Sequence, residues 1–152
     1  MVSEPLVLAE RSAPEGGPAV ELRIDVPSDL SSIEQAVELV SARCEALGMQ
    51  QHAARFNLRV ALTEALANAI IFGNGVGSAT PVTVVALLRE SALRVEVVDV
   101  GGGFDPDQVP DPTAPDRIEL PDGRGLFLIR HLVDEVSFSK RGNAICMVLR
   151  PT

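Results

Sequence analysis

Two polar side chains stand in an otherwise apolar helical pattern and could do chemistry together. Glu64 and Asn68 are four residues apart in the segment 62–68, so on a helix they project from one face, one turn apart. A carboxylate and an amide among Ala, Leu and Ile are unfavourable in a core unless a partner satisfies them, and a metal ion and a hydroxyl group would do so. The alternative is a solvated helix face on which the two side chains share a hydrogen bond worth ~0.2–0.5 kcal/mol.

A third candidate, Asp99, ends an apolar strand pattern and is followed after one residue by the glycine run 101–103. Its carboxylate would be a buried acceptor beside backbone that a flat ligand can approach closely. The glycines do not form the dinucleotide fingerprint G-x-G-x-x-G, no helix pattern follows them directly, and the chain has no P-loop motif. The alternative is a turn residue that hydrogen-bonds its own backbone.

A long irregular segment separates Asp99 from two further glycines. Residues 106–123 alternate prolines with acidic residues and show no period, and a loop of this length inside a compact domain is usually functional or disordered. Gly123, Arg124 and Gly125 then precede a short helix pattern that starts at Leu126. Free amides and the positive end of a helix dipole at that point suit an anion, whereas the alternative is a plain turn that needs positive φ.

The composition limits the classes of function. The chain has 152 residues, a net charge of −8, and Lys140 as its single lysine. This balance disfavours nucleic acids and anionic membranes as partners, and bound phosphates would need magnesium, amides or arginine nearby. Cys44 and Cys146 lie in apolar patterns and are expected to be small core residues in a reducing compartment. Because there is no basic leader and no apolar run of membrane length, we expect a cytoplasmic protein.

The elements that must position these residues follow from hydrophobic periodicity. Alternation predicts a strand over 19–26, and helical spacing predicts one helix from a Ser31–Glu34 capping box to Gly48. A second helix is predicted from about Gln51 to Phe72, ended by the segment 73–75.

Two hairpins complete the predicted sheet. The first spans 82–100 and the second 135–149, with the short helix at 126–133 between them. The order strand, helix, helix, hairpin, long loop, helix, hairpin predicts an α+β fold, a two-layer sandwich with a mixed, mostly antiparallel sheet and helices on one face. Residues 1–18 are predicted to be a flexible tail and residues 19–152 a single domain.

Three ordered motifs resemble those of the GHKL ATPases, which include gyrase, histidine kinases and the ninety-kilodalton heat-shock chaperone. Glu64-x-x-x-Asn68 resembles their N-box, residues 99–106 are similar to their adenine box, and residues 123–130 resemble their second glycine box. The run Gly-Phe-Asp-Pro, the Pro-rich segment, Gly-Arg-Gly-Leu and Val-Asp-Glu-Val are closer still to the bacterial anti-sigma-factor serine kinases of the RsbW and SpoIIAB type. The resemblance covers residues 20–150 and implies the Bergerat fold.

The resemblance implies that the chain binds ATP with Mg²⁺. Asn68 would coordinate the magnesium ion, which also bridges phosphates, and Asp99 would accept a hydrogen bond from the adenine amino group. Gly101 and Gly103 would let the backbone approach the base, and residues 106–122 would form the ATP lid.

The resemblance also implies roles around the phosphates. The amides of Gly123, Arg124 and Gly125 would meet them, and Arg124 would either lend charge to the transferring phosphate or be a solvated lid residue. Glu64 would be the general base that takes the proton of an attacking serine hydroxyl, a contribution of ~10²–10⁴-fold.

Three departures from the family pattern concern positions in or close to these motifs. Val100 replaces a frequent glutamate after Asp99, and we expect it to be tolerated because that side chain should point away from the site. Phe72 stands where relatives often carry histidine, and a packing role is expected for it. Asn143 and Ala144 stand where relatives often place threonine near the adenine, which leaves a second, water-mediated contact to the base open.

The function implied by the resemblance is that of an anti-sigma factor that is also a serine/threonine protein kinase. It would phosphorylate an antagonist (anti-anti-sigma) protein on serine in a partner-switching circuit. The unphosphorylated antagonist would capture this protein and free the sigma factor, and a homodimer is expected. Two alternatives stay open: a regulator that binds proteins, with or without nucleotide, but has no kinase activity, and an accessory kinase with a different protein target.

Overall fold

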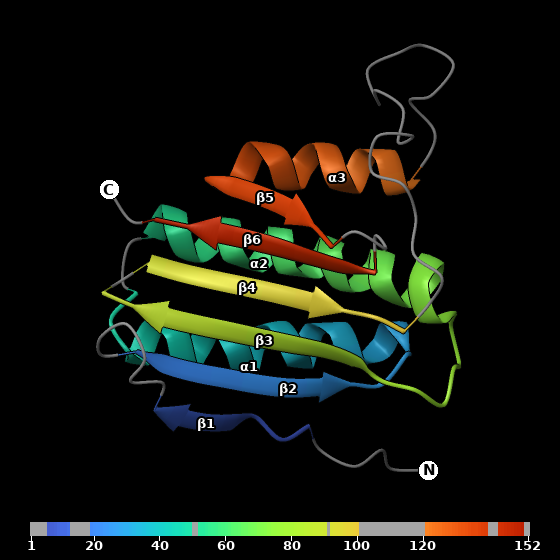
Figure 1. Cartoon of the computed structure of the whole chain (residues 1–152), viewed down its shortest axis with the longest axis horizontal. Helices are drawn as coiled ribbons and strands as arrows, with labels where there is room; N and C mark the ends of the chain where they lie inside the picture. The colour runs from blue at the N-terminus through green and yellow to red at the C-terminus, as the bar shows by residue number, and fades with distance from the viewer. Residues whose placement is uncertain are drawn as a thin grey trace.

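The computed structural model of the chain describes residues 6–12, 19–49, 52–90, 92–100, 121–139 and 143–150. Its strands form one open sheet in the order β1-β2-β3-β4-β6-β5, and every pairing between them is antiparallel (Figure 1). The strands are β1 (Ala9–Ser12), β2 (Val20–Val26), β3 (Val82–Arg89), β4 (Ala92–Val98), β5 (Glu135–Phe138) and β6 (Ala144–Leu149). The segment that contains the proposed lid lies between the end of β4 at Val98 and the start of β6 at Ala144. Because β4 pairs with β6, Val98 and Ala144 lie opposite each other and the two ends of this segment are close together.

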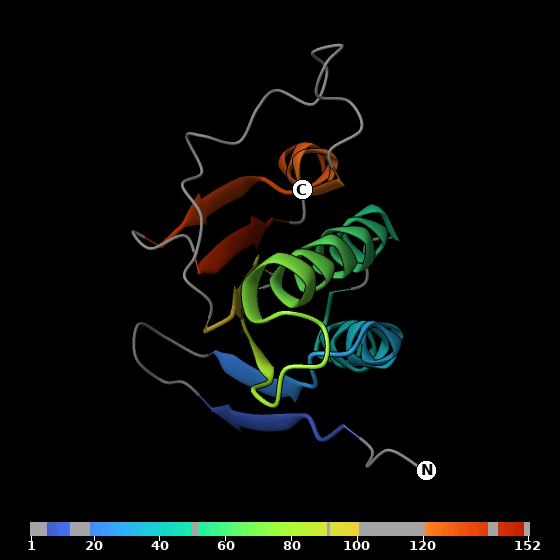
Figure 2. The same ribbon diagram turned by 90° about the vertical axis from the view of Figure 1, so that its right-hand side faces the viewer.

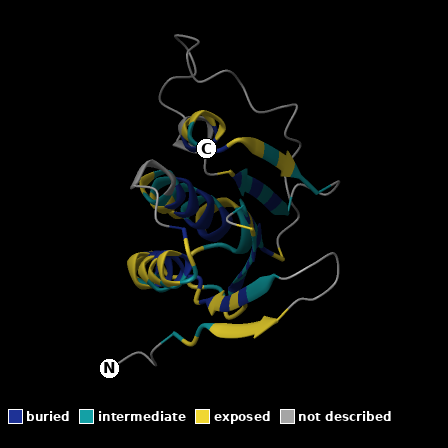
Figure 3. Ribbon diagram, turned by 90° about the vertical axis from the view of Figure 1, so that its left-hand side faces the viewer, coloured by how far each residue is buried: buried dark blue, intermediate teal, exposed yellow. Residues whose placement is uncertain are grey.

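Three α-helices cover one face of this sheet, and none of the described helices lies on the other face (Figures 2 and 3). They are α1 (Ile33–Ala46), α2 (His52–Asn68) and α3 (Pro121–Leu132), and two short segments, the 3-10 turn η1 (Leu30–Ser32) and the π-helix η2 (Ala69–Asn74), adjoin them. The predicted two-layer α+β fold is therefore confirmed, with antiparallel ladders throughout the described strands. No helix in the described ranges has both the length and the apolar character needed to cross a bilayer.

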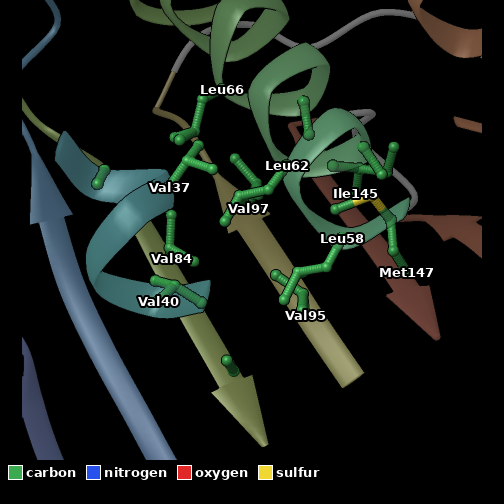
Figure 4. Close-up of a cluster of buried hydrophobic side chains, with 14 of the residues drawn as sticks. Val37, Val40, Leu58, Leu62, Leu66, Val84, Val95, Val97, Ile145 and Met147 are labelled. Carbon is green, nitrogen blue, oxygen red and sulfur yellow. The ribbon is translucent and has the colours of Figure 1, made fainter. Parts of the chain in front are cut away.

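The core lies between the helices and the sheet, where alternate strand residues are buried. In β3, for example, Val82, Val84, Ala86 and Leu88 are buried while the residues between them are half-buried. Leu58, Leu62 and Leu66 recur at four-residue spacing along α2 and point from this helix toward the sheet (Figure 4). Each fully buried side chain of this size contributes ~1.5–3 kcal/mol, so α2 is held firmly above the central strands.

The two cysteines differ in environment. Cys44 is a core residue, as predicted, and burial raises the pKa of its thiol to about 11, so it stays protonated near neutral pH. Cys146 is half-buried in β6, at a position whose neighbours Ile145 and Met147 are buried in the core. Both are free thiols.

The start of α1 differs from the prediction. The expected Ser31–Glu34 capping box is wrong, because the 3-10 turn η1 precedes the α-helix and Asp29 caps that turn instead. The Asp29 carboxylate accepts a hydrogen bond of 3.0 Å from the backbone N–H of Ser31, and Ser32, at the N-cap of α1, makes no side-chain cap bond.

The N-terminal segment contains a strand where a tail was expected. Residues 9–12 form β1, which pairs with β2 from Ala9 opposite Arg23 to Ser12 opposite Val20. An ion pair between Glu10 and Arg43 links this edge strand to α1, and the Arg43 guanidinium lowers the pKa of the Glu10 carboxyl. The sheet is therefore one strand wider than the alternation in the sequence predicted, because β1 is exposed on every residue and carries no periodic apolar signal.

Candidate functional site

Glu64 and Asn68 lie on the last turns of α2, as predicted. Both are half-buried, whereas their neighbours Leu62, Ala65 and Leu66 are at most 2% exposed. Asn68 is the last α-helical residue and stands directly before the π-helix η2. The apolar residues thus anchor the helix in the core and leave one carboxylate and one amide at its border.

Helix α3 brings the second glycine motif onto this pair. Its neighbour in the helical layer is α2, and a Cβ atom placed on Gly125 would lie 3.0 Å from Asn68 Nδ2 and 3.1 Å from Glu64 Oε2. Only a residue without a side chain lets the backbone of α3 approach this closely without moving its neighbours. The N-box pair and Gly125, which are far apart in the sequence, therefore meet.

Helix α3 begins earlier than the sequence predicted. It starts at Pro121, five residues before the expected start at Leu126, so Gly123, Arg124 and Gly125 are helical. Proline is favoured at a first helical position because its φ is already helical and no N–H is lost there. The backbone N–H groups of this first turn as far as Gly123 have no partner within the helix, and the positive end of the helix dipole lies there. The prediction that the Gly125 amide meets phosphates is wrong, because an α-helix that starts at Pro121 uses this N–H for its own bond to the Pro121 carbonyl.

Asp99 follows β4 and is 7% exposed. Its backbone N–H donates to the carbonyl of Asn143 (2.9 Å), and the Asn143 side-chain amide donates to the Asp99 carbonyl (3.1 Å). Ser139 Oγ in turn donates to Asn143 Oδ1 (2.9 Å). The connection between β5 and β6 thus holds the backbone of Asp99 on both its donor and its acceptor.

The Asp99 side chain lies against the π-helix that continues α2. A Cβ atom placed on Gly73 would overlap Asp99 Cγ and Oδ2 and would lie 2.8 Å from Asp99 Cβ. Because η2 follows α2 without a break, one continuous helical path carries Glu64, Asn68 and Gly73. The three polar residues singled out from the sequence are therefore placed along one structural unit, with Glu64 and Asn68 under α3 and Asp99 at the far end.

Sequence reasoning missed Asn143, Gly73 and Asn74 as parts of this site. Asn143 was noted only as a departure from the family pattern, and Gly73 and Asn74 only as the end of a helix. The π-helix directly after Asn68 could not be predicted from hydrophobic periodicity. Such segments are rare and occur frequently at functional sites, so this one would have pointed to Gly73 and Asn74. The packing role expected for Phe72 is wrong, because its side chain in η2 is 51% exposed.

Several predicted site residues lie outside the described residues. These are Gly101 and Gly103 of the glycine run and positions 106–120 of the proposed lid, whereas 121 and 122 belong to α3. Gly123 and Arg124 lie in helix α3, and the Arg124 side chain is outside the described part of the structure.

The donor set around Asn68 fits a hard cation that keeps other ligands. Within the described ranges no group of three or more His, Cys, Asp and Glu side chains could hold a metal ion. Asn68 instead offers one amide oxygen, with the Glu64 carboxylate beside it at the Gly125 contact. Mg²⁺ is commonly held in this way, by one or two protein oxygens together with waters and substrate phosphates.

Comparison with known proteins agrees with this arrangement. The family model of the histidine kinase-like ATPase domain matches residues 26–149, which run from the last residue of β2 to the last residue of β6. A search of curated protein sequences found no significant match. The matched range contains the whole helical layer, both glycine contacts and Asp99, and covers most of the chain. The chain therefore belongs to the family of histidine kinase-like ATPase domains.

Proposed function

We propose that the protein binds Mg-ATP beside α2, η2 and the first turn of α3, and transfers the γ-phosphoryl group to a serine of an antagonist protein. One observation carries the proposal: Gly125 packs on Glu64 and Asn68, while Gly73 of the same helical path packs on Asp99. A residue suited to act as a general base, one suited to hold a metal-bound triphosphate and one suited to bind a purine are thereby held along one helical path. Membership of an ATPase domain family supports ATP as the nucleotide.

Asp99 would recognise the adenine base. Its carboxylate is almost entirely buried and its backbone is held by Asn143. A hydrogen bond from the exocyclic amino group of adenine to a buried carboxylate contributes ~1.5–3 kcal/mol, because the acceptor is charged. This contribution would select adenine over bases that carry an oxygen at the same position.

Asn68 and the first turn of α3 would hold the phosphates. Asn68 would give an amide oxygen to a bound magnesium ion, and that ion would supply positive charge to the phosphates. The amides at the start of α3, which have no partner within the helix, would donate to phosphate oxygens. Such local groups are needed because the chain carries a net charge of −8 and has 13 Lys and Arg in total.

Glu64 would act as the general base in the transfer step. Its carboxylate would take the proton of the serine hydroxyl while the serine oxygen forms a bond to the γ-phosphorus. The bond from that phosphorus to the β–γ bridging oxygen breaks, and ADP leaves with the electron pair. Glu64 is half-buried and lies beside Asn68 at the Gly125 contact, so base and metal ligand would face the same phosphate.

The proposed biological role is anti-sigma regulation by partner switching. The motif pattern that resembles anti-sigma-factor kinases supports it, and so does the acidic charge, which suits partners with basic contact surfaces. The partners would be an antagonist protein, phosphorylated on serine, and a sigma factor or comparable regulator. The protein would act as a homodimer in the cytoplasm.

The test is transfer of radiolabelled phosphate from ATP to a candidate antagonist, compared between the wild type and Glu64→Gln. We expect magnesium-dependent labelling of a serine in the antagonist and its loss in the variant, with nucleotide binding retained. Thermal shifts with nucleotide, with and without Mg²⁺, report binding separately, because a ligand stabilises the folded state by mass action. Nucleotide binding without any phosphate transfer would contradict the kinase proposal and indicate a regulator that only binds. Transfer to a protein unrelated to sigma factors would indicate an accessory kinase.

A further inference from the structure

The π-helix η2 (Ala69–Asn74) joins the catalytic helix α2 to the loop before β3, and the proposed function assigns nothing to it. Its last two residues, Gly73 and Asn74, both contact the strand end that carries Asp99. The wider turn of a π-helix changes which residues of the helix face a neighbour. The question is therefore what Gly73 and Asn74 do for Asp99.

Gly73 sets the space that the Asp99 side chain occupies. A methyl group at position 73 would overlap two atoms of the carboxylate, Cγ and Oδ2, so the carboxylate would have to leave its place. Rotation of the side chain would not suffice, because the added Cβ would still lie 2.8 Å from Asp99 Cβ, closer than real Cβ contacts occur. Any residue other than glycine here would displace the Asp99 side chain and would force a shift between the backbones of residue 73 and Asp99.

Asn74 holds the backbone on the other side of Asp99. Its Oδ1 accepts a hydrogen bond of 2.8 Å from the N–H of Val100, the residue after Asp99. Its Nδ2 donates to the Thr80 carbonyl (2.9 Å) and to Ser28 Oγ (3.2 Å), and Ser28 is buried. One amide thus ties the strand end to the loop that follows η2 and to the loop that follows β2.

Together with Asn143, these contacts hold the aspartate between two parts of the fold. Asn143 binds the N–H and the carbonyl of Asp99, whereas Asn74 binds the next N–H along the chain. Gly73 adds the steric limit. We propose that Gly73 and Asn74 are positioning residues that set the Asp99 carboxylate and so determine base selectivity. This inference rests on the proposed function, in which Asp99 recognises adenine.

The first experiment measures selectivity directly. The dissociation constants of ATP and of purine riboside triphosphate, which lacks the 6-amino group, are compared in each variant. Their ratio reports the contacts of the 6-amino group, and the Asp99→Ala variant gives the share that depends on the Asp99 carboxylate. We expect a ratio of about tenfold or more in the wild type, since a bond to a charged acceptor is at stake, and a ratio near one in Gly73→Ala. A variant that weakens both nucleotides equally and keeps the ratio would overturn the inference.

Asn74 allows a conservative rescue. Asn74→Asp keeps an oxygen acceptor for the Val100 N–H but loses the donor to Thr80 and Ser28, whereas Asn74→Ala loses both. We expect a reduced ratio in Asn74→Ala, and a higher ratio in Asn74→Asp assigns the positioning to the Val100 bond, whereas equally reduced ratios assign it to the amide as a whole. Ratios at the wild-type value in both variants would show that Asn74 does not position the aspartate.

A second experiment does not depend on nucleotide binding. The loss of thermal stability caused by Gly73→Ala is measured in two backgrounds, the wild type and the Asp99→Gly variant. We expect the methyl group to lower Tm strongly in the wild type and much less in the Asp99→Gly background, since the overlapping atoms are gone there. If Gly73→Ala alone does not fold and the double variant does, the steric coupling is shown, whereas equal losses in both backgrounds contradict it.

The two failures can be distinguished. If the wild type and Asp99→Ala have the same ratio for the two nucleotides, the adenine role in the proposed function fails. If Asp99→Ala lowers the ratio and Gly73→Ala does not, the role of Asp99 stands and only the positioning role of Gly73 is wrong.

Discussion

The two glycine contacts at the site differ in how much change they tolerate. At Gly73 an added methyl group would overlap the carboxylate of Asp99, a residue that is 7% exposed and held through its backbone. At Gly125 it would lie 3.0 and 3.1 Å from the ends of Asn68 and Glu64, which are half-buried and can shift slightly. The Asp99 end of the site is therefore rigid, and the Glu64 end retains freedom to adjust.

This difference suits the two tasks of the proposed function. Recognition of a planar base depends on a hydrogen bond whose strength falls steeply with geometry, so a fixed acceptor is an advantage. Proton removal and phosphoryl transfer involve two substrates, ATP and a serine side chain. The groups that act on them must be able to shift slightly as bonds form and break. Variants at the rigid end should therefore change nucleotide affinity, and variants at the adjustable end should change rate.

The largest expected effect is on the rate at the Glu64 end. Glu64→Gln keeps the shape of the side chain and removes its basicity, so phosphoryl transfer should fall by ~10²–10⁴-fold while the affinity for ATP stays the same. Initial rates of antagonist labelling measure the loss. Glu34→Gln is the matched control, because Glu34 is an exposed glutamate on α1, and its rate should equal that of the wild type. A Glu64→Gln variant that transfers phosphate at the normal rate would contradict both the role of Glu64 as general base and the assignment of rate control to its end of the site.

At the Asp99 end the expected effect is on binding. Asp99→Asn replaces one charged acceptor oxygen by a donor, so ATP affinity should fall by on the order of 10- to 100-fold, the value of a hydrogen bond to a charged group. Isothermal calorimetry measures it. Asp25→Asn is the control, since Asp25 lies exposed on β2 and contacts Thr83. Unchanged affinity in Asp99→Asn would refute the adenine role.

Asn68 lies at the Glu64 end but, as the proposed magnesium ligand, it should affect nucleotide binding, and only when magnesium is present. Asn68→Ala should weaken Mg-ATP binding by about 10- to 100-fold, the range found when the surroundings of a metal ligand are disturbed, and should change ATP binding without Mg²⁺ little. Calorimetry with Mg²⁺ and with a chelator separates the two terms. Asn57→Ala on the same helix controls for the general effect of the substitution. Equal losses under both conditions would contradict the ligand assignment.

Gly125→Ala should have the smallest effect and is the direct counterpart of Gly73→Ala. A methyl group at 3.0–3.1 Å from the Asn68 and Glu64 side chains requires these side chains to move by a few tenths of an ångström. The transfer rate should fall by less than ~10²-fold, the loss associated with a displacement of a full ångström, and base selectivity should not change. A loss of selectivity in Gly125→Ala as large as in Gly73→Ala would show that the two ends are one rigid unit.

Local patterns predicted the residues of the site better than the boundaries around them. Four-residue spacing placed Glu64 and Asn68 on one face of a buried helix, and alternation placed Asp99 at a strand end, because both signals depend on which residues face the core. The start of α1 was mispredicted because Asp29 competes with Ser31 for the capping position. The start of α3 was placed too late because Gly123 and Gly125 are poor helix formers, and tertiary packing against α2 overrides that preference.

The sequence by itself determined the class of the fold, the apolar faces of the strands and helices, and the three motifs from which an ATP site was predicted. Those features depend on the spacing of residues along the chain, so they can be predicted from the 152-residue sequence before any tertiary contact is known. Only the tertiary structure decided that Gly125 meets Glu64 and Asn68, that Gly73 leaves room for Asp99, and that Asn74 and Asn143 hold that residue. These contacts join segments that are distant along the chain, and their distances depend on how α2, η2 and α3 pack on the sheet.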